Sequence, residues 1–445
     1  MRLLKNRLLF TMCCLVISGF STESMASAFQ LFEQDGASVG NYHAGYAAEA
    51  NDASIAFYNP AGMTRIRNQQ IVLAGLGVLT DFQYKGTVAV NNLATNGVYD
   101  VPIPVTAQGG LFSFIPNLFY VTPLSERFSF GLSVVVPFGL RANYGRSTDL
   151  RYASTFASVK VVDVSPTLAY QMTDKASFGI GPDLQRMSVE FDQYAVLDDP
   201  SNYATSVNRA DDTGYGAHFG WLYQFTQDSR LGISYHSQVV HHLSRRSTFS
   251  GPLADLLNEN GGPVVTRASA DITLPAYTAL SLYHRFNPKV ALMGSAIYTQ
   301  WSTVRSLVMK NVAGIIIQNG IPVTVIPEVV IPQNFHNTWN FSIGADYFVN
   351  DKLTLKSGIG YDQTPVKNKF RNVMLPDNDR YVLAFGGHYQ ISKAVGIDLG
   401  WMHLFIDQAK VSPPPQVTGS QITTTNGNVT GGADVYSTQV TWDII

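Results

Sequence analysis

Few side chains in this sequence are grouped in a way that supports catalysis or metal binding. His241 and His242 are adjacent in the chain. Adjacent residues of a strand point to opposite faces, so we expect two unrelated side chains at the end of a strand rather than a metal site. No motif brings a serine and a histidine into one site, as a serine hydrolase requires. We therefore expect no enzymatic activity.

Charged residues cluster in a few segments that read as loops. Four aspartates offer the oxygen ligands that Ca²⁺ takes, but without EF-hand spacing, and we assign no metal site to them. They are Asp198, Asp199, Asp211 and Asp212. Five arginines could bind lipopolysaccharide phosphates or steer a carboxylate headgroup, because a guanidinium group suits both. For these we favour the alternative, ordinary solvated loop charge. They are Arg141, Arg146, Arg151, Arg245 and Arg246.

Residues 1–28 have the pattern of a secretory signal peptide. Basic residues precede an apolar run from Leu8 to Ile17, and small residues precede position 29. A transmembrane helix needs about 20 apolar residues, roughly twice this run. Both cysteines, Cys13 and Cys14, lie inside this segment. The mature chain is therefore expected to have no disulfide, no thiolate metal site and no cysteine nucleophile.

The composition argues against nucleic-acid binding and favours β-sheet. With a net charge of −2 and 14% charged residues, the chain lacks the basic face that nucleic acid attracts. Its 37 glycines, 22 tyrosines and 25 phenylalanines point to sheet rather than to charged helical surfaces. No segment after residue 28 is apolar over the length of a membrane helix, so a membrane form must be a closed barrel. We expect no cofactor.

Several segments alternate bulky apolar and polar side chains with a period of two. They are residues 215–225, 339–349, 352–362, 381–391 and 395–405. This pattern is typical of a strand with one lipid-facing and one wet face. The segments run over about 10 to 15 residues, which is long for soluble sheets and suits tilted strands that cross a membrane.

Short and long connections alternate along the chain. The six short turns lie at 123–126, 173–174, 226–229, 287–288, 350–351 and 391–392. The seven long loops lie at about 83–115, 138–157, 192–211, 247–270, 306–336, 366–378 and 410–432. Outer-membrane barrels have short periplasmic turns and long extracellular loops. We therefore predict an all-β fold, a fourteen-stranded antiparallel transmembrane β-barrel over residues 71–445 with both ends in the periplasm.

Residues 29–70 precede the first strand, which is expected near 71–82. A segment of this size could hang free, form a separate domain, or fold back as a plug inside the barrel. Its alanines, glycines and aromatic residues favour packing over disorder, and we prefer the plug.

Two long loops are unusually apolar. Residues 307–331 contain many valines and isoleucines, and exposed apolar patches mark ligand or partner sites. This segment could instead extend as a hairpin or pack over the barrel mouth. In the loop 247–270, Pro252 suits the first position of a short helix with Leu253, Leu256 and Leu257 on one face.

Sequence motifs recur in the order seen in one membrane family. Residues 36–40 read Gly-Ala-Ser-Val-Gly, and residues 58–63 read Tyr-Asn-Pro-Ala-Gly-Met. Residues 115–117, 274–275 and 375–380 read Ile-Pro-Asn, Leu-Pro and Leu-Pro-Asp-Asn-Asp-Arg. Over essentially the whole mature chain the sequence resembles the FadL-like outer-membrane transporters of long-chain fatty acids and aromatic hydrocarbons.

The resemblance implies a barrel closed by an N-terminal hatch, and passive transport without nucleotide or metal. It also implies capture at the extracellular surface, passage to an inner site, and lateral exit where the third strand is kinked. The hatch or gate residues are then Asn59, Pro60 and Ala61. The expected hydrophobic ligand pocket comprises Phe29, Phe32 and Phe57. The expected lateral gap lies at Ser129, Phe130 and Gly131, where Gly131 permits close approach or a bulge.

The predicted function is passive transport of hydrophobic compounds, with long-chain fatty acids as the preferred cargo, across the outer membrane of a Gram-negative bacterium. We expect a monomer that contacts outer-membrane lipid and lipopolysaccharide. One alternative is a general porin, with an open lumen and a charged constriction. Another is a surface adhesin or receptor that uses the barrel only as a base.

Overall fold

The computed structural model describes residues 28–92, 101–196, 202–258, 261–318 and 321–444. The predicted signal peptide therefore lies outside the described residues except for Ala28, and so do Asp198 and Asp199. None of the helices in the described part of the chain is long and apolar enough to cross a membrane.

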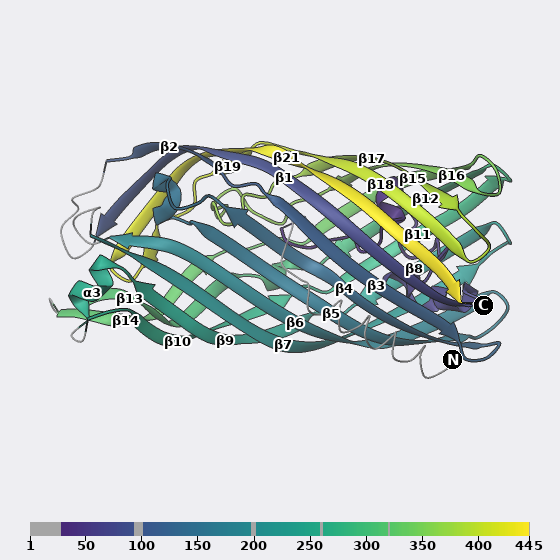
Figure 1. The fold of residues 1–445 in the computed structure, drawn as a ribbon, viewed down its shortest axis with the longest axis horizontal. Helices are drawn as coiled ribbons and strands as arrows, with labels where there is room; N and C mark the ends of the chain where they lie inside the picture. The colour runs from purple at the N-terminus through teal and green to yellow at the C-terminus, as the bar shows by residue number, and fades with distance from the viewer. Residues whose placement is uncertain (1–27, 93–100, 197–201, 259–260, 319–320, 445) are drawn as a thin grey trace.

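Fourteen antiparallel strands form a closed barrel (Figure 1), which confirms the predicted fold. In order around the barrel they are β1 (Gln69–Asn92), β3 (Phe112–Pro123), β4 (Phe128–Asn143), β5 (Phe156–Gln171), β6 (Ala176–Val196), β7 (Tyr203–Gln224), β8 (Ser229–His236), β11 (Tyr277–Asn287), β12 (Val290–Thr299), β15 (Thr338–Phe348), β16 (Leu353–Asp362), β17 (Arg380–Gln390), β18 (Val395–Ile406) and β21 (Gln421–Ile444). Pairing of β1 with β21, from Gln69 with Ile444 to Asn92 with Gln421, closes the ring.

Short turns join the strands at one end of the barrel and long excursions join them at the other. β1 begins and β21 ends at the short-turn end (Figure 1). Four of the long connections carry extra strands, which are β2 (Ile103–Gln108), β9 (Val239–Ser250), β10 (Val264–Leu274), β13 (Ser306–Gln318), β14 (Ile321–Pro332), β19 (Ala409–Val411) and β20 (Gln416–Thr418). β1 extends past residue 82, the expected end of the first strand, and residues Gln83 to Val88 pair there with β2.

The two faces of the barrel wall differ as the alternation predicts. Large apolar side chains are exposed on the outer face, with Ile343 at 64% and Leu399 at 61% relative exposure. Their neighbours on the inner face, such as Ser342 and Asp398, are buried. An apolar outer face and a polar inner face suit a barrel surrounded by lipid.

The N-terminal segment fills the lumen near the short-turn end. It contains η1 (Ser38–Asn41), α2 (Ile55–Tyr58) and η2 (Pro60–Arg65), and almost all of its residues are buried. It packs against wall glycines. An added Cβ at Gly232 would lie 1.8 Å from the carbonyl oxygen of Ala47. Small residues at these places let the backbone of the hatch approach the wall closely.

The apolar segment 307–331 forms the hairpin β13–β14, and its Val312, Ile326 and Val329 are also buried in a core cluster at the barrel mouth. The segment is therefore a hairpin that packs in part over the barrel mouth, while Ile321 and Val330 remain exposed. The helix α3 (Pro252–Leu257) begins at Pro252 as expected, with Leu253 fully buried. Leu256 departs from the expected shared face, because its side chain is 68% exposed.

Candidate transport pathway

An apolar cavity of about 140 Å³ lies between the hatch and the long-loop end of the barrel. Its apolar lining residues are Phe29, Leu140, Val159, Met187, Phe191, Ile272, Val304, Leu307, Phe335, Met374 and Leu375. Asp271, Thr273, Thr303, Ser306, Gln333 and Asn372 complete the lining. Apolar cavities of about 150 Å³ are known to stay dry and bind benzene-sized ligands. The site is therefore suited to a hydrocarbon group.

The loop that supplies Met374 and Leu375 folds inward and is fixed by buried arginines. Arg371 donates from Nε to the carbonyl oxygen of Asp377 at 2.6 Å. Arg380 is fully buried and pairs with the Asp377 carboxylate. The Leu-Pro-Asp-Asn-Asp-Arg motif thus has a structural role, because it holds two apolar residues against the cavity.

Of the three phenylalanines expected to form a ligand pocket, the structure places only Phe29 at this cavity. The Phe29 ring contacts the fully buried Trp301 edge-on, with centroids 4.9 Å apart. Phe32 and Phe57 belong to a separate core cluster that packs the hatch against the wall. The other lining residues come from separate strands and loops, and of these the sequence patterns had drawn attention to Leu307 and Leu375.

Asn59, Pro60 and Ala61 form a turn whose backbone is fixed by the asparagine side chain. Asn59 is fully buried and extended, and its Oδ1 accepts a hydrogen bond from the amide of Ala61 at 3.1 Å. Pro60 occupies the first position of η2, where its missing N–H costs nothing. Asn59 Nδ2 donates to the carbonyl oxygens of Ala47 at 2.6 Å and Trp221 at 3.1 Å. This side chain therefore links two parts of the hatch to β7.

The same turn is seated on glycines of the wall. An added Cβ at Gly179 of β6 would lie 2.5 Å from the carbonyl carbon of Pro60. An added Cβ at Gly131 of β4 would lie 2.3 Å from the sulfur of Met63. Gly131 thus allows close approach of the hatch, one of the two roles expected of it.

The pairing between β3 and β4 stops halfway along the two strands. Leu118 to Pro123 pair with Val134 to Ser129, and the register between the two strands ends there. Against its other neighbour, β5, strand β4 shifts register between Val135 and Phe138. Ser129, Phe130 and Gly131 are paired regularly on both sides, so the structure places the interruption further along β4 than the sequence analysis did.

Beyond this point the hatch takes the place of β3 as the partner of β4. The amide of Leu31 donates to the carbonyl oxygen of Pro137 at 2.9 Å, and the amide of Gly139 donates to that of Phe29 at 2.7 Å. Proline lacks an amide donor and tolerates a bulge, which explains why Pro137 can sit here.

Gln34 completes this arrangement with its side-chain amide. Its Oε1 accepts from the amide of Val136 at 3.1 Å, and its Nε2 donates to the carbonyl oxygen of Val136 at 3.1 Å. Asn117 of β3 donates to the carbonyl oxygen of Gln34 at 2.6 Å. One hatch residue therefore bridges both sides of the interruption in the wall.

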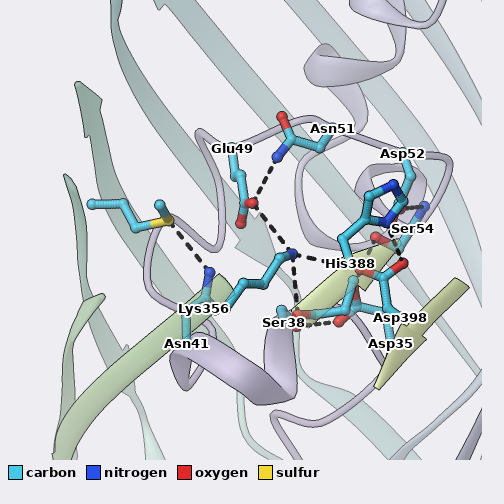
Figure 2. A network of polar contacts seen from close by, with 12 residues as sticks. Asp35, Ser38, Asn41, Glu49, Asn51, Asp52, Ser54, Lys356, His388 and Asp398 are labelled. Carbon is cyan, nitrogen blue, oxygen red and sulfur yellow. Dashed lines mark hydrogen bonds and ion pairs between the residues drawn. The ribbon is translucent and has the colours of Figure 1, made fainter. Parts of the chain in front are cut away.

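A buried lysine ties the hatch to the opposite wall. Figure 2 shows Lys356 of β16 between Glu49 of the hatch and Asp398 of β18, at 3.9 Å from each carboxylate. Its Nζ also donates to the carbonyl oxygen of Ala37 at 3.2 Å, and His388 lies 3.0 Å from Asp398. Burial raises the pKa of Glu49, and the charge of Lys356 opposes that rise.

A second polar cluster lies within the hatch itself. The Tyr58 hydroxyl donates to Asp35 at 2.9 Å, and Ser38 bonds both to Asp35 and to Nδ1 of His43 at 2.7 Å. Burial raises the pKa of Asp35, and burial lowers the pKa of His43 to about 3. Hydrogen bonds between buried polar groups therefore hold the hatch together, and burial changes the pKa values of two of them, Asp35 and His43.

Two pairs of residues set aside in the sequence lie on strands: His241 and His242 on β9, and Asp211 and Asp212 on β7. His241 is fully buried and the side chain of His242 is 75% exposed, so the two do point to opposite faces. Asp211 is neutralised by arginines, including Arg245 at 3.0 Å, and Asp212 accepts from the amide of His242 at 3.0 Å. Asp211 and Asp212 thus bond to residues of the neighbouring strand β9.

Comparison with known proteins places the chain in a family. Residues 17–444 match the model of the outer membrane protein transport protein family (OMPP1/FadL/TodX). The chain belongs to this family. Outer membrane protein P1 of Haemophilus influenzae is 26% identical, covering 85% of this chain and 86% of that protein. The long-chain fatty acid transport protein of Escherichia coli O6:H1 is 24% identical, covering 90% and 92%.

Solved structures of FadL relatives have the same fold. A Pseudomonas aeruginosa FadL homologue superposes with a TM-score of 0.80 at 26% identity, covering 93% of this chain and 99% of that one. The Pseudomonas putida toluene transporter TodX superposes with a TM-score of 0.68 at 18% identity, covering 94% and 100%. As a FadL-family member, the protein transports hydrophobic compounds across the outer membrane of a Gram-negative bacterium and is not an enzyme.

Membership of the FadL family agrees with the filled lumen. A general porin requires an open lumen, whereas residues 28–68 occupy this one. A polar cavity of about 470 Å³ lies on the short-turn side of the hatch. Its lining includes Arg65, Arg230, Arg285, Asp346 and Asp443. The apolar and polar cavities thus lie on opposite sides of the hatch.

Proposed function

We propose that this FadL-family protein carries long-chain fatty acids from the extracellular surface into the apolar cavity and releases them sideways through the wall. The apolar hairpin β13–β14 and the helix α3 stand at the entrance. The interruption between β3 and β4 is the exit. The hatch, anchored by Asn59, Pro60 and Ala61, blocks the direct path through the lumen.

One observation carries the proposed exit: the β4 backbone from Val136 to Gly139 pairs with the hatch and not with β3. A barrel wall is normally closed by strand–strand hydrogen bonds, which leave no passage for a side chain or ligand. Where the hatch replaces the neighbouring strand, a small movement of residues 29–34 exposes a route from the cavity to the membrane, because Phe29 also lines that cavity.

The cavity lining determines how a fatty acid would bind. Among the described residues that line it, none is a lysine, arginine or histidine, and Asp271 is its one carboxylate. A carboxylate headgroup buried here would lack a cationic partner, and the exposed Asp271, which bonds to His242, supplies none. The cavity would therefore hold the hydrocarbon tail, with the headgroup outside it.

The same lining favours a second cargo, an uncharged hydrocarbon. A volume of about 140 Å³ is close to that of apolar cavities that bind benzene, and an aromatic hydrocarbon needs no cationic partner. Displacement of a bound fluorescent fatty acid by oleate and by toluene distinguishes the two. Displacement by toluene alone at low concentration would favour the hydrocarbon, and displacement by neither would contradict both cargoes.

Deletion of Pro137 tests the lateral exit. Two residues of β4, Val136 and Pro137, stand opposite Val162 of β5 within the register shift, so the deletion restores a regular ladder. We expect the variant to fold and bind ligand but to lose uptake. The matched control, Pro137→Val, keeps the extra residue and should keep uptake. Normal uptake by the deletion variant would refute the proposed exit.

A further inference from the structure

Three metal-ligating side chains meet on the inner face of the barrel, away from the apolar cavity. Asp183 of β6, His218 of β7 and His236 of β8 are buried on neighbouring strands, and His218 pairs directly with His236. The three potential ligand atoms lie within 4.8 Å of one another. From this cluster we propose that the protein binds a divalent transition-metal ion of the Zn²⁺ type.

The hydrogen bonds of the two histidines fix which ring nitrogen faces the cluster. His236 Nε2 lies 3.2 Å from the carbonyl oxygen of Phe57, which can only accept, so Nε2 carries the proton. Thr167 donates its hydroxyl hydrogen to the carbonyl oxygen of Ser165 at 3.3 Å. Its oxygen can then accept from His218 Nε2 at 3.1 Å. His236 Nδ1 carries a lone pair, and His218 Nδ1 is the nitrogen that contacts the Asp183 carboxylate.

Both Nδ1 atoms face the same carboxylate. His218 Nδ1 lies 2.5 Å from Asp183 Oδ1, and His236 Nδ1 lies 3.9 Å from Asp183 Oδ2. Lone pairs that converge on a carboxylate repel it unless a positive charge lies between them. A proton on His218 Nδ1 makes its contact with Asp183 a hydrogen bond, but the lone pair of His236 Nδ1 still faces the other carboxylate oxygen. A proton on each ring would place two cations in stacked rings whose centroids are 5.1 Å apart, which is unfavourable in a buried site. A single metal ion satisfies both nitrogens and the carboxylate.

The surrounding groups match those of a metal site. Metal-bound histidines usually donate their second N–H to a carbonyl or another polar acceptor, as His218 and His236 do here. Ser165 donates at 2.6 Å to Asp163 and lies 3.0 Å from Asp183, so two buried carboxylates share one hydroxyl. Gln185 also donates to Asp163 at 2.8 Å, and a divalent ion would offset the charge of two carboxylates in one buried cluster.

Two imidazoles and one carboxylate suit Zn²⁺ and its neighbours in the first transition series. Ligand atoms about 2.0–2.1 Å from such an ion lie about 3.3 Å apart in a tetrahedral site. The contacts of 2.5 and 3.9 Å between the two Nδ1 atoms and the Asp183 carboxylate lie on either side of this separation.

Metal binding at this place would strengthen the attachment of the hatch. Along β7, His218 shares its face with Gly220, which Asn59 of the hatch contacts. His236 bonds to the carbonyl oxygen of Phe57 in α2. The ion would thus link three wall strands and, through His236, the hatch helix.

Metal titration of the full-length protein in detergent tests the proposal. After treatment with a chelator, we expect one equivalent of Zn²⁺ to bind, and Co²⁺ to give visible absorption bands of a nitrogen- and oxygen-ligated ion. His218→Gln and His236→Gln should each weaken binding at least tenfold. The control His242→Gln changes an exposed histidine and should bind as the unmodified protein does.

A heat-modifiable shift in gel mobility shows which variants are folded. In a separate measurement, Zn²⁺ should raise the unfolding temperature of the unmodified protein but not that of His236→Gln. If the unmodified protein binds no more Zn²⁺ than the His218→Gln/His236→Gln double variant, the proposal is refuted. Equal binding by folded His236→Gln would also refute it. Because metal binding is measured without transported ligand, failure here leaves the transport proposal intact.

Discussion

The side chain of Asn59 occupies the space that a side chain at Gly220 would need. An added Cβ at Gly220 would lie 1.9 Å from Asn59 Oδ1. Asn59 also donates to the carbonyl oxygen of Trp221, the next residue of β7, at 3.1 Å. The triplet Asn59, Pro60 and Ala61 of the hatch is therefore fitted to Gly220 of the wall. The sequence of either segment alone does not show this contact.

Gly220→Ala should loosen the hatch. The added methyl group collides with a buried, hydrogen-bonded side chain, and overpacking of this kind costs about 1–3 kcal/mol. We expect a lower unfolding temperature and an increase in ion conductance in planar bilayers. Gly294→Ala is the matched control, because its Cβ would meet one atom, the carbonyl oxygen of Ser342 at 3.3 Å. Unchanged conductance of Gly220→Ala would show that this contact does not hold the hatch.

Lys356→Met should destabilise the hatch from its other side. The substitution leaves the Glu49 and Asp398 carboxylates buried without their shared cation, and breaking such a pair costs about 3–5 kcal/mol. Hydrogen exchange of hatch amides should become faster, and the protein should unfold at lower denaturant concentration. Lys352→Met, at an exposed turn position, should change neither. Equal exchange in both variants would contradict a role for Lys356 as the anchor.

His43 should make the attachment of the hatch weaker in acid. Burial lowers its pKa from 6.5 to about 3, so the native hatch favours the neutral ring. Its stabilising contribution is complete above pH 6.5 and is lost as the pH falls through that window towards 3. Nearby carboxylates with raised pKa values act in the opposite direction, so the comparison must be with His43→Gln. The stability difference between the two proteins should shrink from pH 7.5 to 4.5, and a constant difference would contradict the prediction.

Met374→Trp should obstruct the apolar cavity. Met374 lines it, and a larger ring fills space that a hydrocarbon would occupy. We expect binding of a fluorescent fatty acid to weaken at least tenfold, which corresponds to about 1.4 kcal/mol. Leu124→Trp, at an exposed position of a short turn, is the control and should bind normally. Normal binding by folded Met374→Trp would place the ligand elsewhere.

Local patterns in the sequence were enough to predict the barrel. Alternation with a period of two identified wall strands, and alternating short and long connections predicted fourteen of them. Both signals depend on neighbours in the chain, because a strand exposes every second residue and a tight turn is made within a few residues. The motifs around Asn59 and Leu375 identified the hatch and the family, which the comparisons confirm.

Only the tertiary structure decided which residues meet. It placed Phe29 at the cavity while Phe32 and Phe57 pack the hatch, and it put the break in strand pairing between Val135 and Phe138. It also assembled Asp183, His218 and His236, which had no spacing to suggest a site. The physical reason is that strand register and the path of the hatch set these contacts across the lumen, and a one-residue shift in register would exchange the two faces of a strand.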